Sequence, residues 1–260
     1  SISYLLDSDN DLVIGSRFKK GSSIIGLSKK RERVSSFANS FARLTLSNNY
    51  KHLSDFMSGC ITFKRNNCLN YIKKIDVSGF KFLYELLSIS KGRLKVDEIP
   101  LNFQLRKYGY SKLDYAVIWD FFISAFHTVL KRIIPRRAIS FGLVGSTGIL
   151  VHLFVVYFLL SITKLTFIQV LPFAGVSAAS SNFLINNLLT FRNARLEGIE
   201  LFGGLLKFLL VSSIPLLANV GLASSFYQYV TPNKFLSQMA GIVVVFIWNY
   251  AASSKFVWKE

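Results

Sequence analysis

Acidic residues are scarce in this chain of 260 residues: 14 Asp and Glu stand against 31 Lys and Arg, a formal net charge of +17. Only two cysteines occur, Cys60 and Cys68. Their spacing fits neither a zinc site nor a disulfide framework, so both are expected to be buried, reduced thiols. The first residues do not combine a basic segment with a continuous apolar one, so they lack the pattern of a secretory signal peptide.

Charge and hydrophobicity divide the chain into two parts. Residues 1–137 hold 24 Lys and Arg and 11 Asp and Glu, whereas residues 138–260 hold 7 and 3. Hydrophobic residues make up 51% of the whole, and the mean hydropathy of +0.39 is high for a soluble domain with this net charge. We therefore expect a basic part of mixed composition, followed by an apolar part.

The apolar part predicts a membrane domain of four helices. Four long stretches have almost no charge, and each reaches the roughly 20 residues needed to cross a hydrocarbon core about 30 Å thick. Because backbone N–H and C=O groups cannot stay unpaired in lipid, the stretches are expected to be helical. The alternative, buried core helices of a soluble protein, rarely gives four consecutive runs of this length. The predicted spans are residues 138–162, 165–191, 208–230 and 235–254.

Lysine and arginine in the connections set the expected orientation. Four cations closely precede the first predicted span, three lie between the second and third, and two follow the fourth, whereas the other two loops hold one each. Positive residues concentrate on the cytoplasmic side of a membrane. Both termini are therefore expected in the cytoplasm, with the protein in the inner or plasma membrane.

The second and fourth predicted spans end alike. "NFLINNLLTF" (182–191) and "NYAASSKFVW" (249–258) each place an Asn-aromatic pair nine residues before an aromatic residue. This repeat predicts a duplication of helix pairs, with Asn182 and Asn249 forming hydrogen bonds between helices. Together with "FGLVGSTGILVHL" (141–153), these segments resemble the GtrA-like four-helix membrane domain. The resemblance implies translocation of lipid-linked sugars, or anchoring of the enzymes that make them.

The basic part predicts an α/β arrangement. Apolar residues at helical spacing favour a helix over 31–46, and a compact amphipathic helix is expected over 80–90. Pro100, in the last predicted strand, suggests an edge or a bulge. There are too few strands for a complete nucleotide-binding domain. The predicted strands are residues 12–15, 58–65 and 93–106.

Three polar residues share one face of the first predicted helix. Arg31, Ser35 and Asn39 are four residues apart, so a guanidinium, a hydroxyl and an amide project from one side. With a second arginine nearby, such as Arg17 after the first strand, this set suits a phosphate, because arginine offers a planar fork of donors. The alternative is an ordinary solvated helix face. Asp55 lies in a loop that leads into a strand, and taken alone it is typical of a turn.

In combination these residues resemble the second half of a polyprenyl-phosphate glycosyltransferase. "DLVIGSRF", Arg31-x3-Ser35-x3-Asn39, "DFMSGC" and "VDEIPLNFQLRKYGYSKL" match this family, which is typified by dolichol-phosphate mannosyltransferase and has the GT-A fold. Its members move a sugar from GDP-mannose or a UDP-sugar to polyprenyl or dolichyl phosphate. The resemblance places Arg17, Arg31 and Ser35 at the acceptor phosphate, Asp55 near the reacting centre as the catalytic residue, and Arg106 and Lys112 on a cationic rim.

The chain departs from that family in its donor half. The complete enzyme has a nucleotide-binding segment and an Asp-x-Asp motif that holds Mg²⁺ or Mn²⁺. "DSD" (7–9) is not expected to be this motif, because Asp9 lies only six residues before Gly15, with no room for a helix between them. No metal ligand is therefore predicted in this chain. We expect the chain alone to be inactive, as a fragment, as the product of a split or decayed gene, or as the partner of a separate chain that supplies the donor half.

An amphipathic segment joins the two parts. Residues 113–137 combine aromatic side chains such as Trp119 with four cations, which is typical of helices at the headgroup level. Anionic lipid, rather than nucleic acid, is the expected partner of the basic surface. The expected domains are an incomplete GT-A α/β domain, juxtamembrane helices and an all-α membrane domain, at residues 1–112, 113–137 and 138–260.

Two functions follow from these resemblances. The first is a membrane-bound glycosyltransferase that transfers a sugar, mannose or glucose, from a nucleotide sugar to polyprenyl or dolichyl phosphate. The alternative is a GtrA-like membrane protein for translocation or anchoring in lipid-linked sugar and cell-surface polysaccharide synthesis, with an inactive soluble remnant. The expected partners are the lipid phosphate, the nucleotide sugar, the bilayer, and either a second copy of the chain or a separate donor chain.

Overall fold

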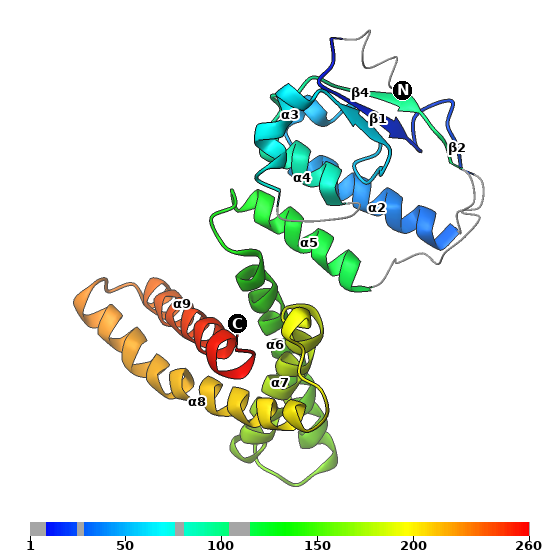
Figure 1. The fold of residues 1–260 in the computed structure, drawn as a ribbon. Coiled ribbons are helices and arrows are strands. Elements are labelled where there is room, and N and C mark those ends of the chain that lie inside the picture. Colours follow the sequence, from blue (N-terminus) through cyan, green and yellow to red (C-terminus); the bar gives the residue numbers. More distant parts are fainter. Residues whose placement is uncertain (1–8, 25–28, 76–80, 104–114, 260) are drawn as a thin grey trace. The chain divides into compact units, whose positions relative to one another are not determined.

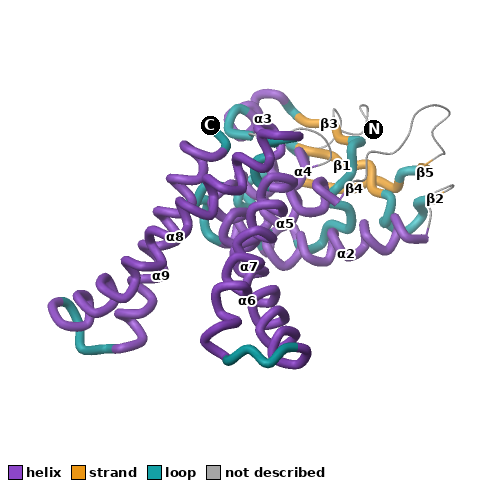
Figure 2. Tube along the Cα trace, turned by 90° about the horizontal axis from the view of Figure 1, so that it is seen from below, coloured by secondary structure: helices purple, strands orange, loops and turns teal. Residues whose placement is uncertain are grey.

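The chain forms two compact units, Ser1–Ile133 and Ile134–Glu260, in a computed structural model (Figure 1). The structure describes residues 9–24, 29–75, 81–103 and 115–259. All described strands belong to the first unit, whereas the described elements of the second unit are helical (Figure 2).

A small mixed sheet organises the first unit. Its strands are ordered β3-β1-β4, with β1 (Leu12–Ser16) in the centre. Strand β4 (Val96–Pro100) is parallel to β1, and β3 (Ile61–Phe63) is antiparallel to it. All five residues of β1 are buried, as expected for the apolar central strand of a sheet. A second pair of short parallel strands is formed by β2 (Ser23–Ile24) and β5 (Asn102–Phe103).

Helices complete the core of the first unit. Phe56, Tyr84, Leu86 and Phe121 join the residues of β1 in one hydrophobic cluster. Phe121 comes from the last helix of the unit and packs edge-on against Tyr84, with ring centroids 5.4 Å apart. The helical elements are α2 (Lys29–Thr45), η1 (Asn48–Tyr50), α3 (Arg65–Ile72), α4 (Lys81–Ser90) and α5 (Tyr115–Val129).

The predicted elements are present, with shifted limits. The strand predicted over 58–65 pairs only at β3, and the one predicted over 93–106 is interrupted at Leu101, between β4 and β5. The apolar residues of α2 are not all buried: Phe37 and Leu44 are 60% and 79% exposed, while Ala42 enters the core, as does Leu46 directly after the helix. The α/β class of this unit is therefore confirmed.

The second unit consists of long helices. Three of them are long and apolar enough to cross a membrane, among the described residues: Arg136–Ile162, Phe167–Leu189 and Met239–Val257. These correspond to the first, second and fourth predicted spans. The predicted third span lies in α8, which begins ten residues earlier than expected, and its membrane crossing stays a prediction. The helices are α6 (Arg136–Ile162), α7 (Phe167–Leu189), α8 (Gly198–Tyr229) and α9 (Lys234–Ala252), which continues as a π-helical turn, η3 (Ser253–Val257).

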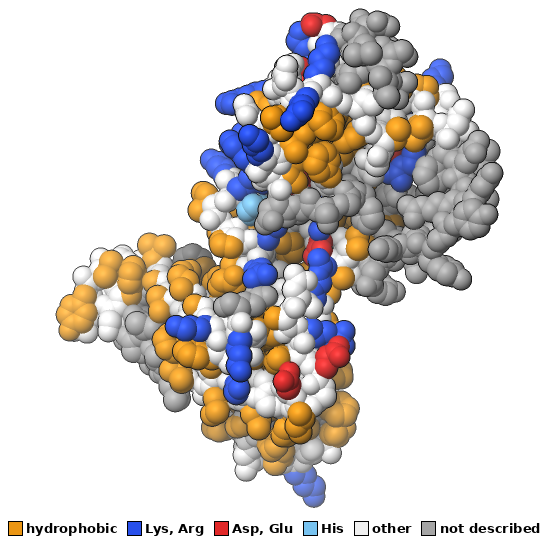
Figure 3. Space-filling view, viewed as in Figure 1, with side chains coloured by type: hydrophobic (Ala, Val, Ile, Leu, Met, Phe, Trp, Pro, Cys, Tyr) orange, Lys and Arg blue, Asp and Glu red, His pale blue; other side chains and the backbone are white. Residues whose placement is uncertain are grey.

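The outer surface of the second unit is apolar. Ile149, Phe154, Tyr157 and Ile168 are each more than 60% exposed. Hydrophobic side chains are spread over much of the visible face of this unit (Figure 3). Monomeric soluble proteins rarely expose so much contiguous apolar surface. This surface fits hydrocarbon, so the chain is a membrane protein.

An aromatic cluster closes one end of the second unit. Trp258 stacks on Phe191 with ring centroids 4.1 Å apart and an interplanar angle of 10°. It also lies against Phe183 and Phe208. The indole N–H of Trp258 donates to Asn187 Oδ1 at 3.0 Å. The last residues of the chain are thereby fixed to the end of α7.

Within the described residues, the hydrogen bonds between helices predicted for Asn182 and Asn249 are not formed by their side-chain oxygens. The side-chain oxygens of Asn182 and Asn249 are buried and accept no hydrogen bond from the described part of the chain. Asn182 instead lies against Gly148, where a Cβ would come within 2.5 Å of its Nδ2. Asn187, in the same segment, does join separate parts of the chain, through hydrogen bonds to Leu196 and Trp258.

Candidate functional site

The candidate site of the first unit lies where β1 ends. Arg17 directly follows β1, and its guanidinium binds the Asp55 carboxylate side-on, with Nε–Oδ2 and Nη2–Oδ1 distances of 2.7 and 2.9 Å. Asp55 also accepts the backbone N–H of Arg17 at 3.2 Å and that of Met57 at 3.1 Å. The Asp55 side chain is fully buried, whereas that of Arg17 is 14% exposed. Two of the residues predicted for the site, Arg17 and Asp55, are therefore in direct contact.

Glu98 holds the loop that carries Asp55. This residue lies on β4, is 5% exposed, and accepts hydrogen bonds from the backbone N–H groups of Ser54 and Asp55 at 2.8 and 2.9 Å. Its other carboxylate oxygen accepts the Ser54 hydroxyl at 2.8 Å. Ser54 Oγ is also 2.7 Å from Ser16 Oγ, at the end of β1. Buried polar groups of this kind are stable only when they are paired, and here the pairing fixes the loop across the ends of two parallel strands.

Asn39 fixes the next residue of the same loop. Its Oδ1 accepts the backbone N–H of Phe56 at 2.9 Å, and the side chain is 4% exposed. Three consecutive backbone donors, at residues 54 to 56, are thus held by side chains from β4 and α2. The polar face predicted on α2 therefore points toward the Asp55 loop at Asn39. Ser35 lies one turn earlier on that face.

The arrangement presents a positioned cation. A guanidinium has five N–H donors, and the side-on contact with Asp55 uses two of them. The end-on edge formed by Nη1 and Nη2 is not engaged by Asp55. Phe18 lies under the guanidinium, with its ring centroid 5.5 Å from Cζ. Arg17 is therefore oriented by its neighbours and keeps donors suited to an oxyanion.

A lysine follows the arginine. Lys19 Nζ donates to the backbone C=O of Glu98 and lies 3.6 Å from Asp97 Oδ1. Its side chain is 40% exposed, so it adds positive charge at the same end of the sheet. Strand ends of this kind are where open α/β sheets bind their ligands.

The remaining predicted site residues are only partly within the described structure. Ser35 lies on α2 and is half-buried. Arg31 lies on α2, but its side chain is outside the described residues, and so are Arg106 and Lys112. The site assignments of all these residues stay predictions.

Sequence reasoning missed Glu98 and Ser54. The signal for Glu98 was available: in a strand, side chains alternate between faces, and Val96 and Glu98 are both buried in β4. A carboxylate on the buried face of a strand needs hydrogen-bond donors, and the loop that contains Ser54 and Asp55 supplies them. Nothing local to Ser54 indicates that it faces Glu98.

The described residues do not form a metal site. Among residues 9–24, 29–75, 81–103 and 115–259, no three His, Cys, Asp or Glu side chains gather as ligands. The carboxylates of Asp55 and Glu98 are already occupied by the donors listed above. Asp9 pairs with Lys95 Nζ at 2.5 Å, and this ammonium lowers the pKa of the carboxyl group. The Mg²⁺ or Mn²⁺ implied by the resemblance does not fit these described side chains.

Comparison with known proteins agrees with both resemblances. Residues 140–258 match the family described as GtrA/DPMS, transmembrane domain, which defines the class of the second unit. The chain is also similar to the dolichol-phosphate mannosyltransferase of Pyrococcus furiosus, with 26% identity over 252 residues. That match covers 96% of this chain and 68% of the relative, so it extends over both units. The chain is thus a homologue of a dolichol-phosphate mannosyltransferase and carries a GtrA/DPMS transmembrane domain.

Proposed function

We propose that this chain provides the acceptor site and the membrane anchor of a glycosyltransferase. The reaction transfers a sugar, mannose or glucose, from a nucleotide sugar to polyprenyl or dolichyl phosphate. The observation that carries the proposal is the Arg17–Asp55 contact, because it holds a guanidinium edge ready for an anion at the end of β1. Homology to a membrane glycosyltransferase over 96% of the chain supports the same conclusion.

The proposed chemistry rests on position rather than on a strong base. A lipid phosphate is ionised at neutral pH and is itself the nucleophile that attacks the sugar. Catalysis then requires that this anion be held in place and that the departing diphosphate be neutralised. Arg17 holds the acceptor phosphate, with Arg31 and Ser35 beside it and Arg106 and Lys112 on the rim. Asp55 orients Arg17, since its carboxylate oxygens already accept four hydrogen bonds.

The membrane unit completes the proposal. Residues 208–230, most of which belong to α8, serve as the third of four spans, and both termini face the cytoplasm. In this proposal the first unit is the acceptor-side part of a GT-A fold and acts together with a donor-binding half. In the cell the protein then works at the inner or plasma membrane, where its lipid acceptor is located.

A product assay tests this function. The chain, supplied with a donor half, is reconstituted with polyprenyl phosphate and given labelled GDP-mannose or a labelled UDP-sugar in separate reactions. We expect one donor to yield a lipid-extractable sugar phosphodiester that mild acid releases. Arg31→Ala should lower the yield by orders of magnitude, because a charge-assisted phosphate contact is lost. If that variant keeps full activity and unchanged acceptor affinity, the assignment of Arg31 to the acceptor site is wrong.

A second function is favoured by one observation. The family match is confined to residues 140–258, that is, to the membrane unit. A GtrA-like protein that moves or anchors lipid-linked sugars, with an inactive soluble part, is therefore the alternative. Absence of any lipid-linked product with every donor, combined with transport of a preformed lipid-linked sugar across vesicles, would favour it.

A further inference from the structure

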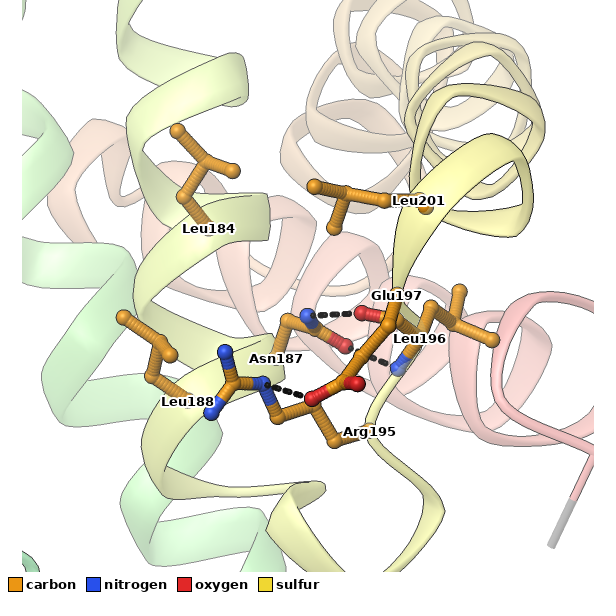
Figure 4. Close-up of a pocket in the computed structure, with 8 residues that line it drawn as sticks. Leu184, Asn187, Leu188, Arg195, Leu196, Glu197 and Leu201 are labelled. Atoms are coloured by element: carbon orange, nitrogen blue, oxygen red, sulfur yellow. Dashed lines mark hydrogen bonds and ion pairs between the residues drawn. The ribbon is translucent and has the colours of Figure 1, made fainter.

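A pocket lies between the end of α7 and the start of α8 (Figure 4). Its volume is about 310 Å³, at the lower end of the range of about 300–1,000 Å³ that is usual for small-molecule sites. One side consists of leucines and the other end of an arginine and a glutamate. The lining residues are Leu184, Asn187, Leu188, Arg195, Leu196, Glu197, Gly198 and Leu201.

Hydrogen bonds from Asn187 fix the backbone at one side of the pocket. Asn187 is 2% exposed, and its amide grips the backbone of Leu196 at both ends: Leu196 N–H donates to Oδ1 at 2.8 Å, and Nδ2 donates to Leu196 C=O at 2.9 Å. The same Oδ1 accepts the indole N–H of Trp258. Leu196 in turn packs over Gly204, where a Cβ would come within 2.4 Å of it. The connection after α7 is thus held in one conformation.

The apolar wall faces the hydrocarbon region. Leu184 and Leu188 lie one turn apart on α7 and are 45% and 48% exposed. They belong to the last turns of α7, a helix long and apolar enough to span a membrane, just before its polar connection to α8. Leu201, one turn into α8, faces them across the pocket (Figure 4). The three leucines therefore form an apolar wall, on which part of an acyl chain could lie.

The polar end lies where lipid headgroups are found. Arg195 Nε is 3.3 Å from Glu197 Oε1, and the two side chains are 50% and 73% exposed. An exposed ion pair of this kind contributes little to stability, because water screens both charges. A lipid phosphate, which offers two oxygens to the guanidinium fork, is a stronger partner than this single carboxylate contact.

We infer that this pocket binds one anionic membrane phospholipid, with its phosphate on Arg195 and one acyl chain between Leu184, Leu188 and Leu201. The occupant follows from the lining, since a leucine wall that leads from a membrane span to a guanidinium complements an amphipathic anion. The inference uses the second unit only, so it stands independently of the proposed function.

Native mass spectrometry of the full chain tests this inference. The protein is purified in detergent and titrated with dioleoyl phosphatidylglycerol, and dioleoyl phosphatidylcholine serves as the comparison lipid. We expect one tightly bound phosphatidylglycerol per chain. Arg195→Gln should weaken this binding about tenfold, because a charge-assisted contact to phosphate is lost. Glu197→Gln should strengthen it a few-fold, because the competing carboxylate is removed.

Matched variants distinguish lipid binding in the pocket from general electrostatic attraction of lipid to the protein. Arg192→Gln removes the same charge from the same connection without lining the pocket, so binding should change less than about twofold. Leu201→Trp and Leu188→Trp fill the pocket and should abolish the tight site. Leu210→Trp places the same ring on an exposed position of α8 away from the pocket and should leave it intact.

Several results would overturn the inference. Equal losses in Arg192→Gln and Arg195→Gln would indicate diffuse charge attraction, and competition by inorganic phosphate at the lipid's concentration would show that no chain is bound. Tighter binding of polyprenyl phosphate than of phosphatidylglycerol would assign the pocket to that lipid instead. A dimer mass that is lost in both tryptophan variants, whatever lipid is present, would identify a second copy of the chain as the occupant.

Discussion

Arg17 and Asp55, which are 38 positions apart in the sequence, form a two-pronged ion pair at the end of the central strand. Asp55 is fully buried, and Arg17 keeps a small exposed fraction. A buried carboxylate that orients a partly exposed guanidinium serves two purposes: it stabilises the loop and it aims the cation. The predictions below separate these purposes.

Removing Asp55 should destabilise the first unit. Loss of one partner from a buried ion pair typically costs about 3–5 kcal/mol, because the remaining charge is left unpaired. Asp55→Ala should therefore lower the unfolding temperature of the full chain, measured by differential scanning fluorimetry in detergent. Asp9→Ala, which removes the exposed partner of Lys95, is the matched control and should leave that temperature unchanged. Equal effects of the two variants would contradict a structural role for the buried pair.

Glu98 should control the order of the Asp55 loop. Glu98→Ala deprives two backbone N–H groups of their acceptor, so amide hydrogen exchange of residues 54 and 55 should become at least tenfold faster. Glu98→Gln keeps a carbonyl oxygen and should show a smaller effect. The neighbouring Asp97→Asn changes charge on a side chain that is 35% exposed and serves as the control. Unchanged exchange in Glu98→Ala would show that the loop is held by other contacts.

Asn187 should be required for the aromatic end of the membrane unit. Asn187→Ala leaves the backbone of Leu196 and the indole of Trp258 without partners, at a cost of about 1–3 kcal/mol for each buried group. We expect a lower unfolding temperature and a red shift of tryptophan emission as Trp258 becomes solvated. Asn193→Ala, an exposed position in the same connection, should leave both readings unchanged. If Asn187→Ala behaves like this control, the hydrogen bonds do not hold the connection.

The two cysteines should differ in reactivity. Burial raises the pKa of the Cys68 thiol to about 11. Cys60 is exposed, so the burial expected for it from the sequence is wrong. Because the thiolate is the reactive form, a maleimide at pH 8 should label Cys60 quickly and Cys68 only after unfolding. Rapid labelling of Cys68 in the folded Cys60→Ser variant would contradict its burial.

The raised pKa of Cys68 also predicts a pH dependence of stability. A thiol whose pKa is about 9 when unfolded and about 11 when folded stabilises the protein fully below pH 9, and this contribution is lost as the pH rises toward 11. Burial raises the pKa of Tyr50 and Tyr84 as well, so these phenols add to the loss above pH 10. The difference in unfolding temperature between the Cys60→Ser protein and the same protein with Cys68→Ala isolates the thiol. That difference should grow smaller from pH 9 to pH 11.

The sequence predicted the elements better than their contacts. Apolar runs were sufficient for β1 and for three membrane helices, because burial in a sheet or in lipid requires continuous hydrophobicity. Helical spacing located α2 but did not identify its buried face, since Phe37 and Leu44 are exposed where Asn39 is buried. Which face of α2 is buried depends on the elements that pack against the helix, and the spacing of residues within the helix does not reveal those elements.

The candidate site shows the same limit. Arg17 and Asp55 were predicted as residues of one site by resemblance, but their direct contact was not expected. A phosphate-binding arginine and a catalytic aspartate were placed separately, and the structure joins them through the loop held by Glu98 and Asn39. The strand periodicity of β4 held an unused signal for a buried Glu98, but its partners come from a loop 43 positions away. Local sequence patterns do not predict contacts between residues that lie so far apart along the chain.

The affinity for the acceptor lipid tests the central claim most directly. Binding of polyprenyl phosphate to the full chain is measured for the unchanged protein, for Arg17→Ala and for Arg65→Ala, which removes an exposed arginine on α3. A charge-assisted contact to phosphate contributes about 1.5–3 kcal/mol, so Arg17→Ala should weaken binding by roughly 10- to 100-fold. Arg65→Ala should bind as the unchanged protein does. Equal affinity of all three proteins would contradict the assignment of Arg17 to the acceptor phosphate.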